Sequence, residues 1–200
     1  MSFLSYLING ISLGSIYAII ALGYTMVYGI ARMLNFAHGD IIMVGGFVVF
    51  TIVSTLGLSP WLGLLVAVAI CTVLGIVIEK VAYCPLRGAS SLAVLITAIG
   101  VSYLLQNLAT YITGGIARAY PDIPFLTQVM QVGSLNVKRI TIITPILTIL
   151  LVVVLVILIQ KTKIGMAMRA VSRDFETAQL MGIKINSVIS VTFVIGSLLA

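Results

Sequence analysis

Long apolar stretches separated by short polar connections dominate this sequence. A helix needs about 20 mainly apolar residues to cross the hydrocarbon core of a bilayer. Four stretches reach that length without argument, 4–30, 61–83, 91–112 and 140–160, and two shorter ones lie at 41–56 and 186–200. A soluble core cannot hide so much apolar surface. The pattern therefore predicts an all-α, polytopic transmembrane helical bundle with about six spans.

The composition agrees with lipid as the surrounding solvent. Apolar residues make up 61% of the chain and charged residues only 8%, whereas soluble proteins carry about 25% charged residues. The net charge of +6 comes from basic residues scattered at the ends of apolar stretches, without the basic face that nucleic-acid binding requires. Cys71 and Cys84 lack the spacing of a metal or redox site. We expect no nucleic-acid partner, no metal, no cofactor and no catalytic residue.

The two short stretches leave questions open. The stretch 41–56 contains Gly45 and Gly46, so it is either a short span or a broken helix held inside the bundle, where irregular backbone is tolerated. The stretch 186–200 stops in the middle of an apolar run. We expect residues 1–200 to form one transmembrane domain that lacks its C-terminal part.

The basic residues predict how the chain is oriented, because cytoplasmic connections are enriched in Lys and Arg. Under strict alternation, one side of the membrane holds the connections 31–40, 80–90 and 161–185. Their basic residues are Arg32, Lys80, Arg87, Lys161, Lys163, Arg169, Arg173 and Lys184. The other side holds only Arg118, Lys138 and Arg139. This difference predicts an outside N-terminus, provided that the stretch 41–56 crosses.

The largest outside connection, 113–139, contains glycines and prolines that favour a structured loop over a span. We interpret it as an external connector, with a docking surface for an external partner as the alternative.

Small residues on the first span predict a helix contact. Gly10, Gly14 and Ala18 recur every four residues, and such stripes let helices in lipid approach closely. We assign them to helix packing.

Polar residues near span ends have a simple interpretation. Gln106 and Asn107 end the fourth span, where headgroups satisfy them, and Glu79 and Lys80 anchor the third span at the inner boundary.

The run NFAHGD precedes the second stretch and holds the only histidine, His38. We expect Asp40 to cap the following helix and to interact with its positive dipole end. The alternative is an intramembrane enzyme that uses His38 and Asp40, but neither a nucleophile nor a second carboxylate stands beside them.

Residues 165–182, GMAMRAVSRDFETAQLMG, are the only place where charges of both signs cluster. Five apolar residues recur at helical spacing and predict one apolar face: Met168, Val171, Phe175, Ala178 and Met181. Ser172 is expected to cap a second short helix after a bend. This amphipathic element can lie on the membrane surface, pack on the chain's own helices, or dock into a partner's groove.

Three longer runs carry a resemblance to a known family: NGISLGSIYAIIALGYTMVYGI, NFAHGDIIMVGGF and KTKIGMAMRAVSRDFETAQLMGI. They resemble the LivH-type permeases of bacterial branched-chain amino acid ABC importers. Within the third run, ETAQLMG is similar to the E-A-A-x-x-x-G loop of importer permeases. Glu176, Ala178 and Gly182 match that loop, while Thr177 replaces the middle alanine.

The resemblance implies a multi-pass permease subunit of an ATP-driven importer in the bacterial inner membrane. Its implied partners are a LivM-like second permease subunit, two cytoplasmic ATPase subunits, membrane lipid, and an external binding protein that delivers leucine, isoleucine or valine. Residues 161–185 would be the cytoplasmic coupling loop, whose apolar stripe enters an ATPase groove. The implied coupling residues are Arg169, Ser172, Phe175, Glu176, Ala178 and Gly182.

ATP hydrolysis is expected on a partner, because this chain has no Gly-x-x-x-x-Gly-Lys-Ser/Thr loop to hold phosphates. The cargo follows from the resemblance alone, and a related importer for urea or short amides remains an alternative. The sequence does not identify the residues that contact the cargo.

Overall fold

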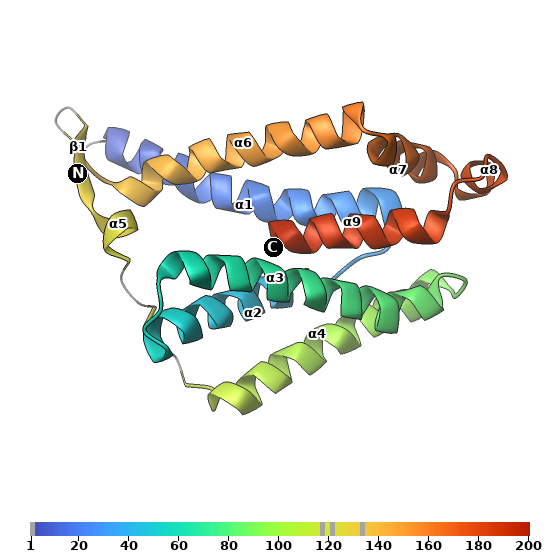
Figure 1. Cartoon of the computed structure of the whole chain (residues 1–200), viewed down its shortest axis with the longest axis horizontal. Coiled ribbons are helices and arrows are strands. Elements are labelled where there is room, and N and C mark those ends of the chain that lie inside the picture. The colour runs from blue at the N-terminus through green and yellow to red at the C-terminus, as the bar shows by residue number, and fades with distance from the viewer. Residues whose placement is uncertain (1–2, 117–118, 121–122, 133–134) are drawn as a thin grey trace.

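Long helices packed side by side make up most of the molecule (Figure 1). The computed structural model describes residues 3–116, 119–120, 123–132 and 135–200. The helices are α1 (Phe3–Ala31), α2 (His38–Phe50), α3 (Pro60–Ile78), α4 (Ser91–Thr113), α5 (Pro124–Thr127), α6 (Arg139–Lys161), α7 (Lys163–Arg173), α8 (Phe175–Leu180) and α9 (Ile185–Leu199). Strands β1 (Val129–Val132) and β2 (Leu135–Lys138) pair antiparallel.

Five helical segments in the described residues are long and apolar enough to cross a membrane: Phe3–Ala31, His38–Thr55, Pro60–Leu86, Ser91–Thr113 and Arg139–Lys161. Helix α9 is apolar but has only 15 residues. The prediction of an all-α polytopic membrane protein is therefore confirmed, and five of the expected spans appear close to their predicted bounds.

Local sequence signals explain where several helices begin and end. The Ser59 and Ser90 hydroxyls accept hydrogen bonds from the first turns of α3 and α4, as N-cap residues do. Pro60 occupies the first turn of α3, where its missing N–H costs nothing. Gly114, with φ of 71°, ends α4 in the left-handed conformation that glycine adopts readily.

The second stretch is continuous through Gly45 and Gly46. Helix α2 begins at His38, earlier than predicted, and continues as a π-helical turn over Thr51–Thr55. The glycine pair therefore does not break this helix. Gly45 instead lets α2 approach α3, because a Cβ there would stand 2.9 Å from the Cys71 Sγ.

Helix α9 lies between α1 and α3 and joins the two halves of the bundle (Figure 1). Small residues permit these contacts, as expected for helices in lipid. A Cβ on Gly196 would stand 2.8 Å from Val27, and a Cβ on Gly75 would overlap the Ser197 side chain. The small side chains of Gly196 and Ser197 therefore allow α9 to approach α1 and α3 closely.

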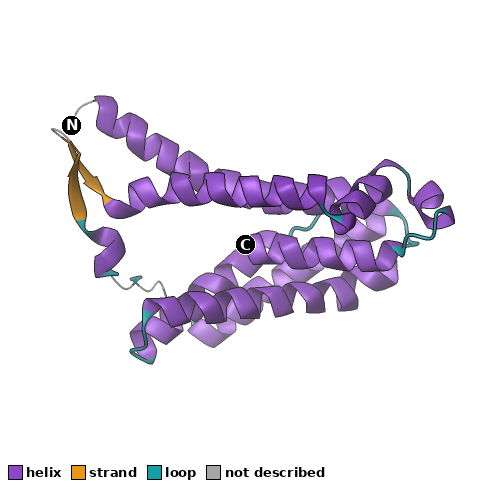
Figure 2. Ribbon diagram, turned by 45° about the horizontal axis from the view of Figure 1, so that its top comes forward, coloured by secondary structure: helices purple, strands orange, loops and turns teal. Residues whose placement is uncertain are grey.

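The β hairpin and the short helices α7 and α8 lie at opposite ends of the bundle (Figure 2). The connection 113–139 forms α5 and the hairpin where it is described, so it is structured as expected. Arg118, counted above among the outside charges, lies outside the described residues.

Candidate functional site

The charged insert folds into two short helices, α7 and α8, with a bend at Asp174. The Thr162 hydroxyl accepts a hydrogen bond from the Gly165 N–H at 3.0 Å and caps α7. Asp174 has extended backbone between the helices, and its carboxylate accepts a hydrogen bond from the Glu176 N–H at 3.0 Å. The expected bend is present, but the cap of the second helix is Asp174 rather than Ser172.

Ser172 does not cap because its hydroxyl donates to the Arg169 carbonyl within α7. Asp174 also accepts a hydrogen bond from the Thr177 hydroxyl. Hydrogen bonds from Thr177 are the main cause that lowers the pKa of the Asp174 carboxyl, because they favour the charged form. Thr177, the departure from the family loop, therefore helps to cap α8.

The apolar stripe of the insert packs on the chain's own helices. Met168 and Val171 have no exposed surface, and Ala178 is 4% exposed. They form one cluster with four residues of α1, α6 and α9: Met26, Ile30, Leu155 and Val188. Among the three arrangements considered above, packing on the chain itself accounts for this stripe. The expectation that the stripe enters a partner's groove is wrong for these three residues.

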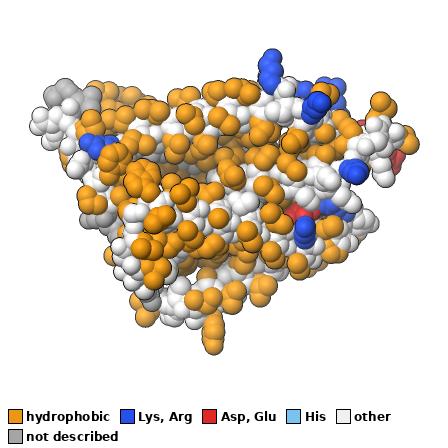
Figure 3. All heavy atoms as spheres, viewed as in Figure 1, with side chains coloured by type: hydrophobic (Ala, Val, Ile, Leu, Met, Phe, Trp, Pro, Cys, Tyr) orange, Lys and Arg blue, Asp and Glu red, His pale blue; other side chains and the backbone are white. Residues whose placement is uncertain are grey.

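A different set of side chains forms the outer face of the insert. Leu180 and Met181 are 86% and 77% exposed, and Arg169 and Glu176 are also exposed. Sequence periodicity placed Met181 on the inner stripe and missed Leu180. Their position at the end of α8, just before Gly182 with φ of 80°, takes them off the helical repeat. On the face in Figure 3, basic side chains gather mostly at this end.

Three contacts of Arg32 help to fix the insert to the bundle. Arg32 has left-handed backbone at the end of α1, and its guanidinium donates to the Ser172 and Arg173 carbonyls at 3.0 and 2.9 Å. The same guanidinium lies 5.2 Å from the centre of the Phe175 ring. A cation at these carbonyls also suits the negative end of the α7 dipole. Phe175 and Ser172 thus serve the attachment of the insert, which no local sequence pattern could reveal.

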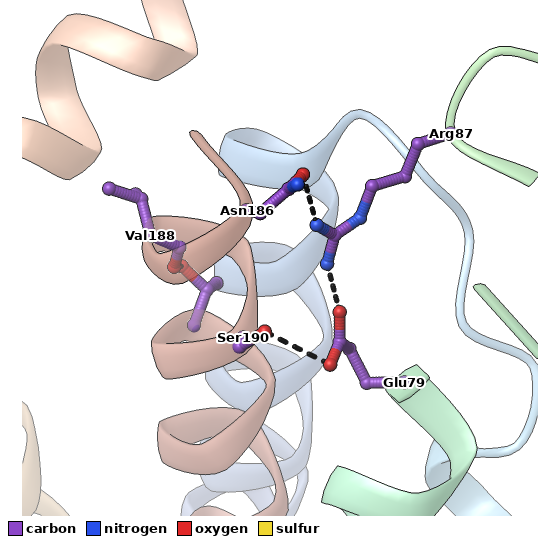
Figure 4. Close-up of polar contacts among 6 residues, drawn as sticks. Glu79, Arg87, Asn186, Val188 and Ser190 are labelled. Carbon is purple, nitrogen blue, oxygen red and sulfur yellow. Dashed lines mark hydrogen bonds and ion pairs between the residues drawn. The ribbon is translucent and has the colours of Figure 1, made fainter. Parts of the chain in front are cut away.

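A buried polar cluster joins α3 to α9 just beyond the insert (Figure 4). Glu79 is 1% exposed and forms an ion pair with Arg87. The Ser190 hydroxyl donates to the other Glu79 carboxylate oxygen at 3.0 Å, and Arg87 also donates to the Asn186 side chain. Glu79 was expected to be an interfacial anchor. It is a buried residue instead, because Arg87 and Ser190 satisfy its charge.

The NFAHGD run provides a second polar contact within the bundle. Asp40 lies inside the first turn of α2 and makes no cap hydrogen bond, so the capping expectation is wrong although the dipole position is as predicted. Its carboxylate accepts from the Ser102 hydroxyl at 2.5 Å and the Gln106 amide at 3.1 Å. Gln106 therefore bonds within the bundle, and α4 continues past it to Thr113.

The proposed enzyme pair finds no support in this geometry. Within the described residues, no hydrogen bond joins His38 to Asp40. His38 instead packs against α1, where a Cβ on Gly23 would stand 2.8 Å from its ring.

The small-residue stripe on α1 is exposed. Nothing described lies within 4 Å of a Cβ placed on Gly10 or Gly14, and Ala18 is exposed as well. Its packing role stays a prediction, and the contacts within the described bundle are made by other glycines.

Residues 6–200 match a protein family described as the permease component of the branched-chain amino acid transport system. The chain is 39% identical to the high-affinity branched-chain amino acid transport system permease protein LivH of Salmonella typhimurium. It is also 39% identical to the corresponding BraD protein of Pseudomonas aeruginosa. Each alignment covers 99% of this chain and 68% of the relative.

A more distant relative is the probable branched-chain amino acid transport permease protein LivH of Methanocaldococcus jannaschii. It is 27% identical, over 91% of this chain and 59% of its own length. No solved structure matches the chain.

Proposed function

Because the chain belongs to the branched-chain amino acid permease family, we propose that it forms part of the membrane path of an ATP-driven importer for leucine, isoleucine or valine. The names of the relatives favour this cargo over urea or short amides. They also favour a transport subunit over the intramembrane enzyme considered from His38 and Asp40.

We propose that residues 161–185 couple this subunit to a cytoplasmic ATPase. The observation that carries this proposal is the division of the insert into two faces. The inner face is fixed by Met168, Val171 and the Arg32 contacts. The outer face presents Leu180 and Met181 beside the exposed Glu176. Water is a poor solvent for two such neighbouring apolar side chains, and a partner groove would cover them.

The attachment of the insert suggests how force reaches the spans. Helix α8 leads through Gly182 directly into α9, and α9 is joined to α3 by the Glu79 cluster. When two ATPase subunits close on ATP, they would move the insert as one body with α9. Helices α9 and α6, which flank the insert, would then tilt and change the side to which the path opens.

The remaining subunits follow from the family of the chain. A LivM-like second permease would complete the path, and an external binding protein would deliver the cargo. We propose that the exposed Gly10, Gly14 and Ala18 stripe packs against a helix outside the described residues. The N-terminus would lie outside, in the bacterial inner membrane, with α7 and α8 in the cytoplasm.

A pull-down in detergent tests the coupling surface. The chain is co-expressed with the ATPase and permease subunits of its transport system, and the retained ATPase is quantified. We expect Leu180→Ser with Met181→Ser, and separately Glu176→Lys, to reduce retention at least about tenfold. Loss of about 1.4 kcal/mol of binding free energy suffices for that change.

Leu58→Ser is the matched control, because Leu58 is 48% exposed in the connection before α3, at the opposite end of the bundle. Undiminished ATPase retention in the inserted and folded outer-face variants would refute the coupling assignment. The family membership would stand in that case.

A further inference from the structure

A pocket of about 970 Å³ opens at the end of the bundle that carries α7 and α8. Its walls come from the end of α1, the connection between α3 and α4, the start of α4, and the segment from α8 into α9. These segments are distant in sequence, so the pocket exists only in the folded protein.

The charges that line this pocket have one sign. Arg32, Arg87 and Lys184 all contribute to its wall, and no Asp or Glu does. Within the described residues, Arg87 alone of the three forms an ion pair, with Glu79 behind the wall. The lining side chains therefore carry a net positive charge. Arg32 is engaged by the Ser172 and Arg173 carbonyls, so Lys184 is the lining cation that has no side-chain partner among the described residues.

Two helix starts add to this positive charge. Helix α4 begins at Ser91 and α9 at Ile185, and both residues line the pocket. Within the described residues, helix α9 has no side-chain cap. The Ser187 and Val188 N–H groups bond to the Lys184 carbonyl, which leaves the N–H groups of Ile185 and Asn186. Positive dipole ends and free N–H groups favour phosphate and other anions.

Another part of the pocket wall is apolar. Val94, Leu95 and Ile189 line it, together with Tyr28 from α1. A ligand that fits both parts has an anionic head and a hydrocarbon tail. A pocket of this kind, beside spans that end at the headgroup level, meets such molecules in the bilayer itself.

We propose that this pocket binds an anionic phospholipid, with the phosphate at Arg32, Arg87 and Lys184 and one acyl chain along Val94 and Leu95. The pocket borders the insert, because Phe175, Gln179 and Lys184 contribute to its wall, but Glu176, Leu180 and Met181 of the outer face do not. The inference does not depend on which side of the membrane faces the cytoplasm. The bound lipid would contact the end of α1 and the starts of α4 and α9 and so join these three helices.

Native mass spectrometry of the purified transport complex tests this site, with phosphatidylglycerol as the probe and phosphatidylcholine as the neutral comparison. Lys184→Glu removes a lining cation that forms no ion pair among the described residues. Lys163→Glu is the matched control, because Lys163 is an exposed lysine of α7 outside the pocket lining. Both variants change the net charge equally.

We expect Lys184→Glu to weaken phosphatidylglycerol binding at least about tenfold and Lys184→Gln roughly fivefold, since one basic residue near a membrane contributes about that factor. Lys163→Glu should bind as the unmodified chain does. Equal binding in all of these proteins would overturn the proposal.

Two further outcomes would also overturn it. In the first, inorganic phosphate displaces the bound lipid with the same efficiency as free phosphatidylglycerol. The pocket would then be a site for small anions that makes no use of an acyl chain. Loss of the ATPase subunit from Lys184→Glu, with lipid binding unchanged, would assign the pocket to an acidic protein surface.

Discussion

At the residue scale, Gly165 determines how closely α7 can turn back on α6. A Cβ at this position would stand 2.2 Å from the Ile159 carbonyl oxygen, and this neighbour is backbone that cannot rotate away. Glycine, the one amino acid without a Cβ, therefore occupies the point where α7 approaches the α6 backbone most closely.

We predict that Gly165→Ala destabilises the folded protein by about 1–3 kcal/mol, the usual cost of overpacking. The measurement is thermal unfolding in detergent. Gly46→Ala is the control, because no atom of the described residues lies within 4 Å of a Cβ there. Equal unfolding temperatures for the two variants would show that the backbone at Gly165 adapts freely.

Asp174 gives the insert a pH dependence. Its pKa is lowered in the folded protein, mainly by the Thr177 hydrogen bonds. The cap therefore stabilises α8 above the ordinary Asp pKa of 3.8, and this contribution disappears as the pH falls through the lower, folded value.

We predict that proteolysis within α8 becomes faster, relative to a variant that does not titrate, as the pH falls below the folded pKa of Asp174. The reason is that the protonated carboxyl is a poorer hydrogen-bond acceptor. Asp174→Asn keeps a capping oxygen and does not titrate, so its cleavage rate provides the reference for the pH dependence of the protease itself. Asp174→Ala should be cleaved fast at every pH. Parallel pH profiles for all three proteins would contradict the capping role.

At the element scale, the attachment of α9 to α3 depends on a charge placed inside the bundle. Glu79 faces partners on two other segments, and a buried carboxylate is costly unless it is paired and hydrogen-bonded. The Gly75 contact with Ser197 brings the same two helices close enough for this cluster to form.

We predict that Glu79→Gln destabilises the protein by about 3 kcal/mol, because Arg87 then lacks its partner. The double variant with Arg87→Gln should cost less than the sum of the two single changes. A double-mutant cycle on thermal unfolding in detergent measures this coupling. Additive effects would mean that the ion pair contributes no stability of its own.

At the scale of the whole molecule, the two ends of the bundle differ in charge and in structure. One end carries α7, α8 and the basic residues around them, and the other carries the β hairpin (Figures 2 and 3). This asymmetry belongs to the assembled bundle, and we expect it to set the orientation of the bundle in a membrane.

Cysteine labelling tests that orientation. In a Cys71→Ala and Cys84→Ser background, Leu58→Cys should react with a membrane-impermeant maleimide added to intact spheroplasts. Lys163→Cys should react only after the membrane is opened. The reverse pattern would place residues 161–185 outside and refute the predicted orientation. Labelling of both cysteines from outside would mean that one of α3, α4 and α6, the three spans between the two positions, does not cross.

Much of the architecture could be predicted because hydropathy is local. Each span shows itself within about 20 consecutive residues, and the predicted bounds of 91–112 and 140–160 differ little from α4 and α6. The polar residues were harder to interpret. Glu79, Asp40 and Gln106 were interpreted from their neighbours in sequence, whereas their actual partners lie on other helices.

The sequence by itself determined that this chain is a helical membrane protein of the permease family with one amphipathic insert, since apolar length, helical spacing and family motifs are all written along the chain. Only the tertiary structure decided which face of that insert is free. Periodicity marks an apolar stripe but not its partner. Met168 and Val171 are buried because α1, α6 and α9 meet beneath them, and that meeting depends on glycine contacts between helices far apart in sequence.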